Sequence, residues 1–434
     1  MPFAFSITRN TLYNALLLNP QRFKEPRYLL LVFSILAGMI AMSVVQGVTA
    51  HIGDFSVFWI AGDNFMRGTP MYTGTGSERF IYPPFAAMLF QLFALMPFKV
   101  ANGLFSFVNF ILLIFSISLS RAILLRYVSN VKRINRILFF STLLFFRFFW
   151  YHVAYTQMNE TILVLSLLGV LLILKKQDMS AAVCFTIATF IKVIPIFFLF
   201  WLLFRGGVKS WATAFLVAMF CIAAPLLWRG TDTGMQDLND YYTTFLEPFK
   251  EGRVEASFHN HSLSSAIYDI TLDMPDKMGL NYNLFHLSES LAKRIYFISF
   301  LLLAGLFVLS IAYRWLRKWP VSLSEVCVIF LTSHLLSGIT WEYHLVSLVF
   351  VYACFLLLLN KNAALPAQLF NYFILTLIVV NALVGPDTVG KTLYHYFGGY
   401  GAVTWMMVLL LFRFLYLCFV EKHEFHAAES QTEK

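Results

Sequence analysis

The chain has 434 residues, of which 59% are hydrophobic and 13% are charged, and its net charge is +9. This composition excludes a soluble domain as the main part of the chain and predicts an all-α, polytopic membrane protein. The positive charges lie in short clusters between apolar runs, which is typical of membrane topology signals and indicates no nucleic-acid partner.

The N-terminal segment carries basic residues ahead of the first apolar run, residues 28–48. That run is too long for a removable signal peptide and lacks a small-residue cleavage site, so the N-terminus is expected in the cytoplasm. The next segment, residues 49–83, is therefore predicted to be the first outer loop.

Two carboxylates, Asp54 and Asp63, stand in this loop. At about 100° per helical residue they face opposite sides of a helix, so they are not expected to form a paired-carboxylate site. The aromatic spacing predicts a short helix lying on the membrane surface through Phe55, Phe58, Trp59 and Phe65. Asp54 would begin that helix, either as an N-cap or as an acid that points toward a catalytic cleft.

Two later apolar runs contain prolines in their interior. Residues 84–119 are interrupted by Pro97 and are expected to cross the membrane once as a long, broken helix. Residues 181–204 are interrupted by Pro195, which lacks the amide hydrogen that a helix interior needs. We therefore expect two half-length helices that meet at Lys192.

The remaining apolar runs, oriented by the positive-inside rule, bring the expected total to about twelve spans with both termini cytoplasmic. A second outer loop is expected over residues 229–294. One membrane domain is predicted over residues 1–420, and the polar tail at 421–434 is expected to be disordered. The unusual polar residues of the sequence thus gather on the outer face.

Two cations fall inside apolar segments, Arg147 and Lys192. A buried cation in a membrane is costly unless it snorkels, pairs or lines a cavity, so each is a candidate to bind a phosphate or carboxylate. For Lys192 the alternative is an ion pair with Glu160 or Glu342. For Arg147 the alternative is a structural pairing within the protein.

Histidines occur at two places on the predicted outer face. His259 and His261 flank Asn260, but two alternating histidines without a placed third ligand are weak support for a metal site, and no metal or cofactor is expected. Glu342 and His344 lie together at the membrane edge, which favours a functional role. The alternative for His344 is an interfacial hydrogen-bonding group.

Five motifs then occur in a fixed order after Asp54. They are "YPPFAAMLFQLFALMP" from Tyr82, "QMNE" from Gln157, "FIKVIP" around Lys192, "HNHSLSSAI" from His259 and "SGITWEYHLVS" from Ser337. Together they resemble glycosyltransferase family 87 of the GT-C superfamily, over roughly Asp54 to Phe350. The chain departs from the family pattern at Thr156, where the family often has glycine, and at His261, where it has glutamine.

The resemblance implies a GT-C-type membrane enzyme that takes a sugar, mannose by preference, from a polyprenyl-phosphate donor. The acceptor would be a glycolipid or a lipid-linked glycan, and the site would face outward from the plasma membrane, in contact with membrane lipids. It implies Asp54 as the general base of an inverting, metal-independent transfer, with Lys192, His344 and Arg147 on the donor phosphate. The implied substrate-binding residues are Tyr82, Gln157, Asn159, His259, Asn260, Ser262, Trp341 and Glu342.

Two other classes of membrane protein stay open at this point. A lipid-sugar transporter or flippase would also use broken helices, but it is expected to have repeat-related halves, and no clear repeat is visible in the sequence. A polymerase or ligase of the O-antigen type would place its functional residues in late outer loops rich in arginine. Here the distinctive acid lies in the first outer loop.

Overall fold

The computed structural model describes residues 26–49, 54–73, 79–250, 257–275, 279–359 and 364–422. All regular elements within these ranges are helices. In chain order they are α2 (Pro26–Val48), α3 (Asp54–Arg67), α4 (Pro84–Ala94), α5 (Phe98–Leu124), α6 (Val131–Ala154), α7 (Asn159–Leu174), α8 (Asp178–Ile191), α9 (Ile196–Arg205), α10 (Val208–Arg229), α11 (Thr231–Tyr241), the π-helix η3 (Tyr242–Leu246), α12 (Glu247–Lys250), α13 (Leu263–Thr271), α14 (Glu289–Leu316), α15 (Leu323–Leu335), the 3-10 helix η4 (Glu342–Ser347), α16 (Leu348–Leu358), α17 (Leu365–Leu383), α18 (Pro386–Val389), α19 (Lys391–Gly399) and α20 (Ala402–Val420).

Six of the described helices are long and apolar enough to cross a membrane, namely α5, α6, α10, α14, α17 and α20. Shorter apolar stretches lie in α2, α4, α7, α8, α9, α15 and the pair η4–α16. The chain is thus a multi-pass membrane protein. The expected twelve spans and the cytoplasmic position of both termini stay predictions, and most of the N-terminal segment and the tail fall outside the described residues.

Both predicted proline breaks are present. Helix α4 ends at Ala94, and α5 begins at Phe98, directly after Pro97. Helix α8 ends at Ile191, and α9 begins at Ile196, directly after Pro195. Lys192 lies between them with extended backbone angles, φ −152° and ψ 128°. Proline also disfavours helical backbone in the residue before it, which explains why the chain leaves the helix here.

Helix α3 does not lie with its aromatic face on the membrane surface, so that prediction is wrong. Phe55, Phe58 and Phe65 are buried inside the protein. Phe58 stacks on Phe90 of α4, with ring centroids 4.8 Å apart. Gly62 permits this close approach, since a Cβ at that position would lie 2.7 Å from the carbonyl oxygen of Phe90. An amphipathic pattern predicts an apolar partner but does not say whether that partner is lipid or protein.

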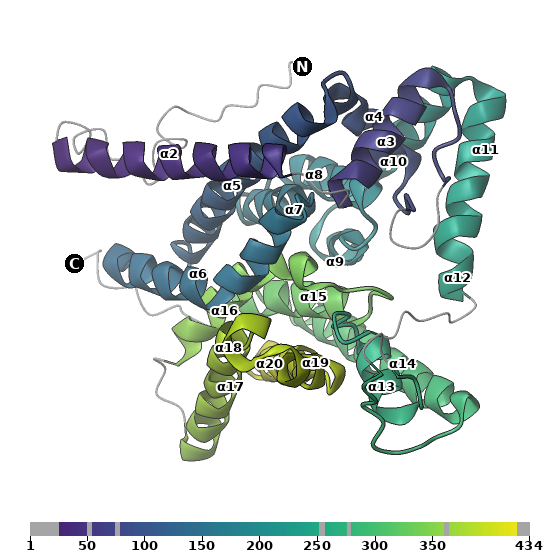
Figure 1. Ribbon diagram of the computed structural model, residues 1–434. Helices are drawn as coiled ribbons and strands as arrows, with labels where there is room; N and C mark the ends of the chain where they lie inside the picture. The colour runs from purple at the N-terminus through teal and green to yellow at the C-terminus, as the bar shows by residue number, and fades with distance from the viewer. Residues whose placement is uncertain are drawn as a thin grey trace.

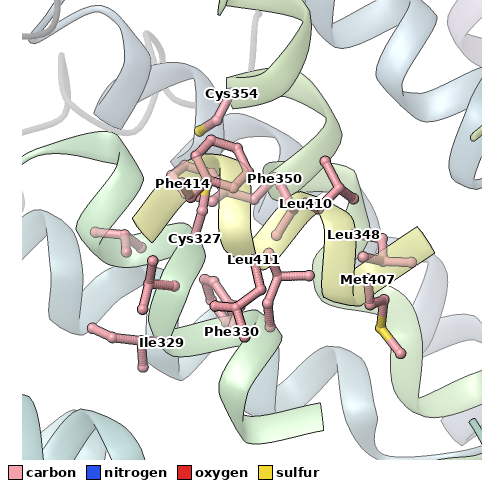
Figure 2. Packing of buried hydrophobic residues seen from close by; sticks show 14 of the residues in the cluster. Cys327, Ile329, Phe330, Leu348, Phe350, Cys354, Met407, Leu410, Leu411 and Phe414 are labelled. Carbon is pink, nitrogen blue, oxygen red and sulfur yellow. The ribbon is translucent and has the colours of Figure 1, made fainter. Parts of the chain in front are cut away.

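A second packed region lies where α15 and α16 meet α20. Figure 2 shows side chains such as Phe330 and Phe350, on the green helices, against Leu411 and Phe414 on the yellow one. These four residues are at most 4% exposed. This core holds the last turn of α15 and the start of α16 in place, and both segments contribute to the site described below.

Figure 1 shows α3 and α4 beside α10 at one end of the molecule, and α13 and α14 at the other. Helices α11 and α12 run along the edge between these ends. They belong to the predicted second outer loop, which is therefore largely helical where it is described. Helices α7, α8 and α9 lie in the middle of the view, between α3 and α15.

Candidate active site

Asp54 is the first residue of α3, and two distant segments contact its carboxylate. The side-chain amide of Gln157, in the turn between α6 and α7, donates a hydrogen bond to Oδ2 of Asp54. The Tyr343 hydroxyl, from η4, donates another. A carboxylate oriented from two sides by donors is suited to accept a proton from a third group.

The turn that carries Gln157 is fixed on both sides. Thr156 has a left-handed backbone with φ 48°, which a β-branched residue rarely adopts. The side-chain amide of Asn109, on α5, donates to the carbonyl oxygen of Gln157 at 2.8 Å. The tight turn thereby directs the Gln157 side chain toward Asp54.

Lys192 lies in the break between α8 and α9, and its side chain is buried. Its ammonium donates to Oδ1 of Asn159 at 2.8 Å, and Nδ2 of Asn159 donates to the Tyr343 carbonyl at 2.9 Å. The ring of Tyr82 lies 5.5 Å from the Lys192 ammonium, a cation–π contact. Four segments thus meet beside Asp54: the break at Lys192, the start of α7, η4 and the stretch before α4.

No carboxylate oxygen of the described residues is within ion-pair distance of Lys192. The predicted alternatives, Glu160 and Glu342, therefore do not neutralise it. The charge of Lys192 does act on the Asp54 carboxylate electrostatically. An ammonium without a carboxylate partner leaves a positive site that an anionic substrate group can occupy.

Burial is the largest influence on Asp54 and raises the pKa of its carboxyl above the ordinary aspartate value of 3.8. The hydrogen bonds from Tyr343 and Gln157 and the charge of Lys192 act in the opposite direction without cancelling the effect. A carboxylate with a raised pKa is a stronger base, which favours proton abstraction near neutral pH.

A small cavity of about 30 Å³ adjoins Lys192. Its polar wall consists of side chains from four segments: Asn159, Ser166, Lys192, Ser333, His334, His344 and Ser347. Its apolar wall includes Leu163, Phe198 and Phe330. The backbone amide of Trp341 donates to Nδ1 of His344 at 3.3 Å, so the proton of that neutral imidazole is on Nε2.

A second polar cluster surrounds Glu342. Its Oε1 accepts from Nδ1 of His259 at 2.9 Å and from the Tyr394 hydroxyl at 2.8 Å, and Nε2 of His261 lies 3.6 Å away. Arg147 donates to the Tyr394 hydroxyl at 3.3 Å and to the Asn381 carbonyl at 2.8 Å.

Arg147 and Glu342 thus both contact the Tyr394 hydroxyl, and neither lines the cavity at Lys192. The contacts of Arg147 with Tyr394 and Asn381 agree with the alternative from the sequence, in which Arg147 pairs within the protein. Its role on the donor phosphate stays a prediction.

Asn260 and Ser262 support the backbone of the same region. Oδ1 of Asn260 accepts from the amide of Thr340 at 2.8 Å, and Ser262 caps the start of α13 through the amide of Ser265. These contacts tie the His259 loop to the segment before η4. A contact of Asn260 or Ser262 with substrate stays a prediction.

Sequence reasoning missed two residues of the site, Tyr343 and His334. Tyr343 lies between Glu342 and His344, two residues that the sequence analysis did select. His334 is an ionisable residue in the apolar helix α15, and such a position is a functional candidate by itself. The signal for both was present in the sequence.

The sequence model of glycosyltransferase family 87 matches residues 80–338, which is more than half of the chain. The chain belongs to this family. The chain is thus a membrane glycosyltransferase of family 87. No curated protein and no solved structure matches it.

The matched range includes Gln157, Asn159 and Lys192 but ends before η4 and begins after Asp54. Asp54 lies outside the matched range, and its hydrogen bond with Gln157 is what places it beside the residues that the family model covers. The left-handed backbone of Thr156 also gives a physical reason for the glycine that family 87 enzymes often have there, since glycine adopts this conformation without strain.

Proposed function

We propose that this family 87 enzyme transfers mannose from a polyprenyl-phosphate donor to a hydroxyl group of a glycolipid or lipid-linked glycan. The observation that carries the proposal is the placement of the Asp54 carboxylate beside the Lys192 ammonium, with Tyr343 and Asn159 linking them. A base and a cation side by side are what a displacement at a sugar phosphate needs. The choice of mannose rests on the resemblance to the family.

In the proposed reaction, the Asp54 carboxylate accepts the proton of the acceptor hydroxyl. The acceptor oxygen attacks the anomeric carbon from the side opposite the phosphate, and the new carbon–oxygen bond forms as the bond to the phosphate oxygen breaks. The leaving phosphate keeps the electron pair, and the reaction inverts the anomeric centre. Lys192 stabilises the charge that develops on the leaving oxygen, a task that a divalent metal performs in other transferases.

The other side chains at the base have positioning roles in this proposal. Gln157 and Tyr343 orient the carboxylate, so that its remaining lone pairs are directed at the acceptor. Asn159 holds the Lys192 ammonium and the η4 backbone at once. Tyr82 covers the ammonium with its ring and keeps water from it.

The proposed site faces outward from the plasma membrane. This orientation rests on the basic clusters of the sequence, which the positive-inside rule assigns to the cytoplasm. The large apolar side chains exposed on the outer surfaces of the helices support a lipid-linked donor, because isoprenoid chains prefer apolar side chains to water. Membrane lipids would surround the remaining exposed apolar helices.

The test uses purified protein in lipid, radiolabelled polyprenyl-phosphate mannose and membrane glycolipids. Three proteins are compared: wild type, Asp54→Asn and Asp63→Asn. Asp63 is a matched control, because it lies on the same helix and its carboxylate pairs with Arg67 at 2.8 Å. Transfer to glycolipid and binding of the donor are measured separately.

We expect wild type and Asp63→Asn to move label, and Asp54→Asn to bind donor without transferring it. Transfer by Asp54→Asn at the wild-type rate would remove Asp54 as the base. Movement of intact labelled lipid across the bilayer, without cleavage of the sugar phosphate, would favour the transporter class instead. Donor binding by wild type without transfer to any glycolipid would reject the acceptor class.

A further inference from the structure

The cavity beside Lys192 contains a buried imidazole that the proposed transfer does not yet use. His334 lies in the last turn of α15 and is 5% exposed. Its Nε2 is 2.7 Å from the Ser347 hydroxyl, whereas Nδ1 has no hydrogen-bond partner among the described residues. A buried nitrogen without a partner is costly, and such groups in native proteins call for an explanation.

The surroundings of His334 indicate what that partner is. The imidazole lines the same cavity as the Lys192 ammonium and His344, and the charge of Lys192 acts on both histidines. When Ser347 donates its hydroxyl hydrogen to Nε2, the proton of the neutral imidazole is on Nδ1. His344 carries its proton on Nε2 for the matching reason, the bond from the Trp341 amide to Nδ1.

The imidazole N–H of His344 is bonded to the Ile339 carbonyl, so the cavity offers the Lys192 ammonium and the N–H of His334, with no carboxylate among its lining residues. Such a set selects an anion with several acceptor oxygens. The volume of about 30 Å³ holds about two water-sized groups, which suits phosphate oxygens and excludes a sugar ring.

We propose that Nδ1 of His334, set as a donor by Ser347, binds a phosphate oxygen of the polyprenyl-phosphate donor together with Lys192. This inference rests on the proposed function, because it names a further contact of the same donor. It makes His334 and Ser347 a unit: Ser347 fixes which nitrogen carries the proton, and His334 touches the ligand. The packed core of α15, α16 and α20 holds this pair, since it includes Phe330, one turn before His334 on α15, and Leu348, which follows Ser347 at the start of α16 (Figure 2).

Two substitutions at one position separate the two nitrogens of the ring. In His334→Asn the side-chain amide reaches about as far as Nδ1, so a donor toward the cavity is kept. In His334→Gln the amide reaches about as far as Nε2, so the contact with Ser347 is kept and the donor toward the cavity is lost. Ser347→Ala keeps the imidazole but removes the group that fixes its proton.

The measurement is the binding of decaprenyl phosphate, and of neutral decaprenol, to purified protein in lipid nanodiscs. We expect His334→Gln to weaken decaprenyl phosphate binding by about tenfold or more, the loss of one hydrogen bond to a charged group. His334→Asn should bind within about threefold of wild type, and Ser347→Ala should fall between the two. Decaprenol binding should be unchanged in all three. Thermal unfolding of each variant shows whether it is folded.

Equal binding of decaprenyl phosphate by folded His334→Gln and wild type would overturn this inference and leave the proposed function standing. An equal loss in His334→Asn and His334→Gln would overturn it as well, because the effect would not follow the Nδ1 donor. If inorganic phosphate bound wild type as tightly as the lipid does, the site would be one for a free anion. Failure of wild type to bind decaprenyl phosphate would reject the donor class and with it the proposed function.

Discussion

Replacement of Lys192 by methionine is the most direct test of the cation in this site. Methionine keeps the length and apolar character of the side chain and removes the ammonium. A hydrogen bond to a charged group contributes about 1.5–3 kcal/mol, so the loss should weaken binding of a polyprenyl-phosphate sugar roughly 10- to 150-fold. Transfer should fall further than binding, because the charge on the leaving phosphate grows in the transition state.

The folded protein should tolerate this change. The bond from Lys192 to Asn159 is lost, and an unpaired buried amide oxygen costs about 1–3 kcal/mol. The change also removes the cost of keeping an ammonium buried without a carboxylate, which is of similar or larger size. We therefore expect the unfolding temperature of the donor-free protein to change by only a few degrees.

The assay measures donor binding and transfer for wild type, Lys192→Met and Lys391→Met. Lys391 begins α19 and is exposed, so its variant controls for the loss of one positive charge. Donor binding by Lys192→Met at the wild-type level, with the unfolding temperature preserved, would refute the role of this ammonium. An equal loss in Lys391→Met would show that net charge is responsible.

Four further predictions concern the pH dependence of transfer and of stability, backbone strain and a buried ion cluster. Because burial raises the pKa of Asp54, transfer should decline as pH falls through a midpoint above 3.8, and a pH–rate profile measures it. Folding favours the protonated form of this group, so wild type should lose stability relative to Asp54→Asn as pH rises through the same range. Thr156→Gly should unfold at a higher temperature than Thr156→Val, because only glycine relieves the left-handed backbone. Glu325→Gln should lower the free energy of unfolding by about 3–5 kcal/mol in denaturation experiments, since it leaves the guanidinium groups of Arg205 and Arg314 without their shared carboxylate.

The fold class, the helix breaks and the family of this protein follow from its sequence alone. Hydropathy determines that the chain is a helical membrane protein, because apolar runs of this length have no other stable state. The chemistry of proline determines the breaks before Phe98 and around Lys192, because it acts on the backbone of its own neighbours. The order of short motifs determines the family, and these motifs contain Gln157, Asn159 and Lys192.

Only the tertiary structure decided how these pieces meet. The aromatic face of α3 packs on α4 and α5 rather than on lipid, because periodicity shows that a face is apolar without naming its partner. Asp54 joins Gln157, which is 103 positions away, through side chains whose directions depend on that packing. Arg147 and Lys192 look alike in sequence, yet one pairs with Tyr394 and the other lines a cavity. A buried charge must find compensation, and which compensation it finds is decided by the helices that surround it.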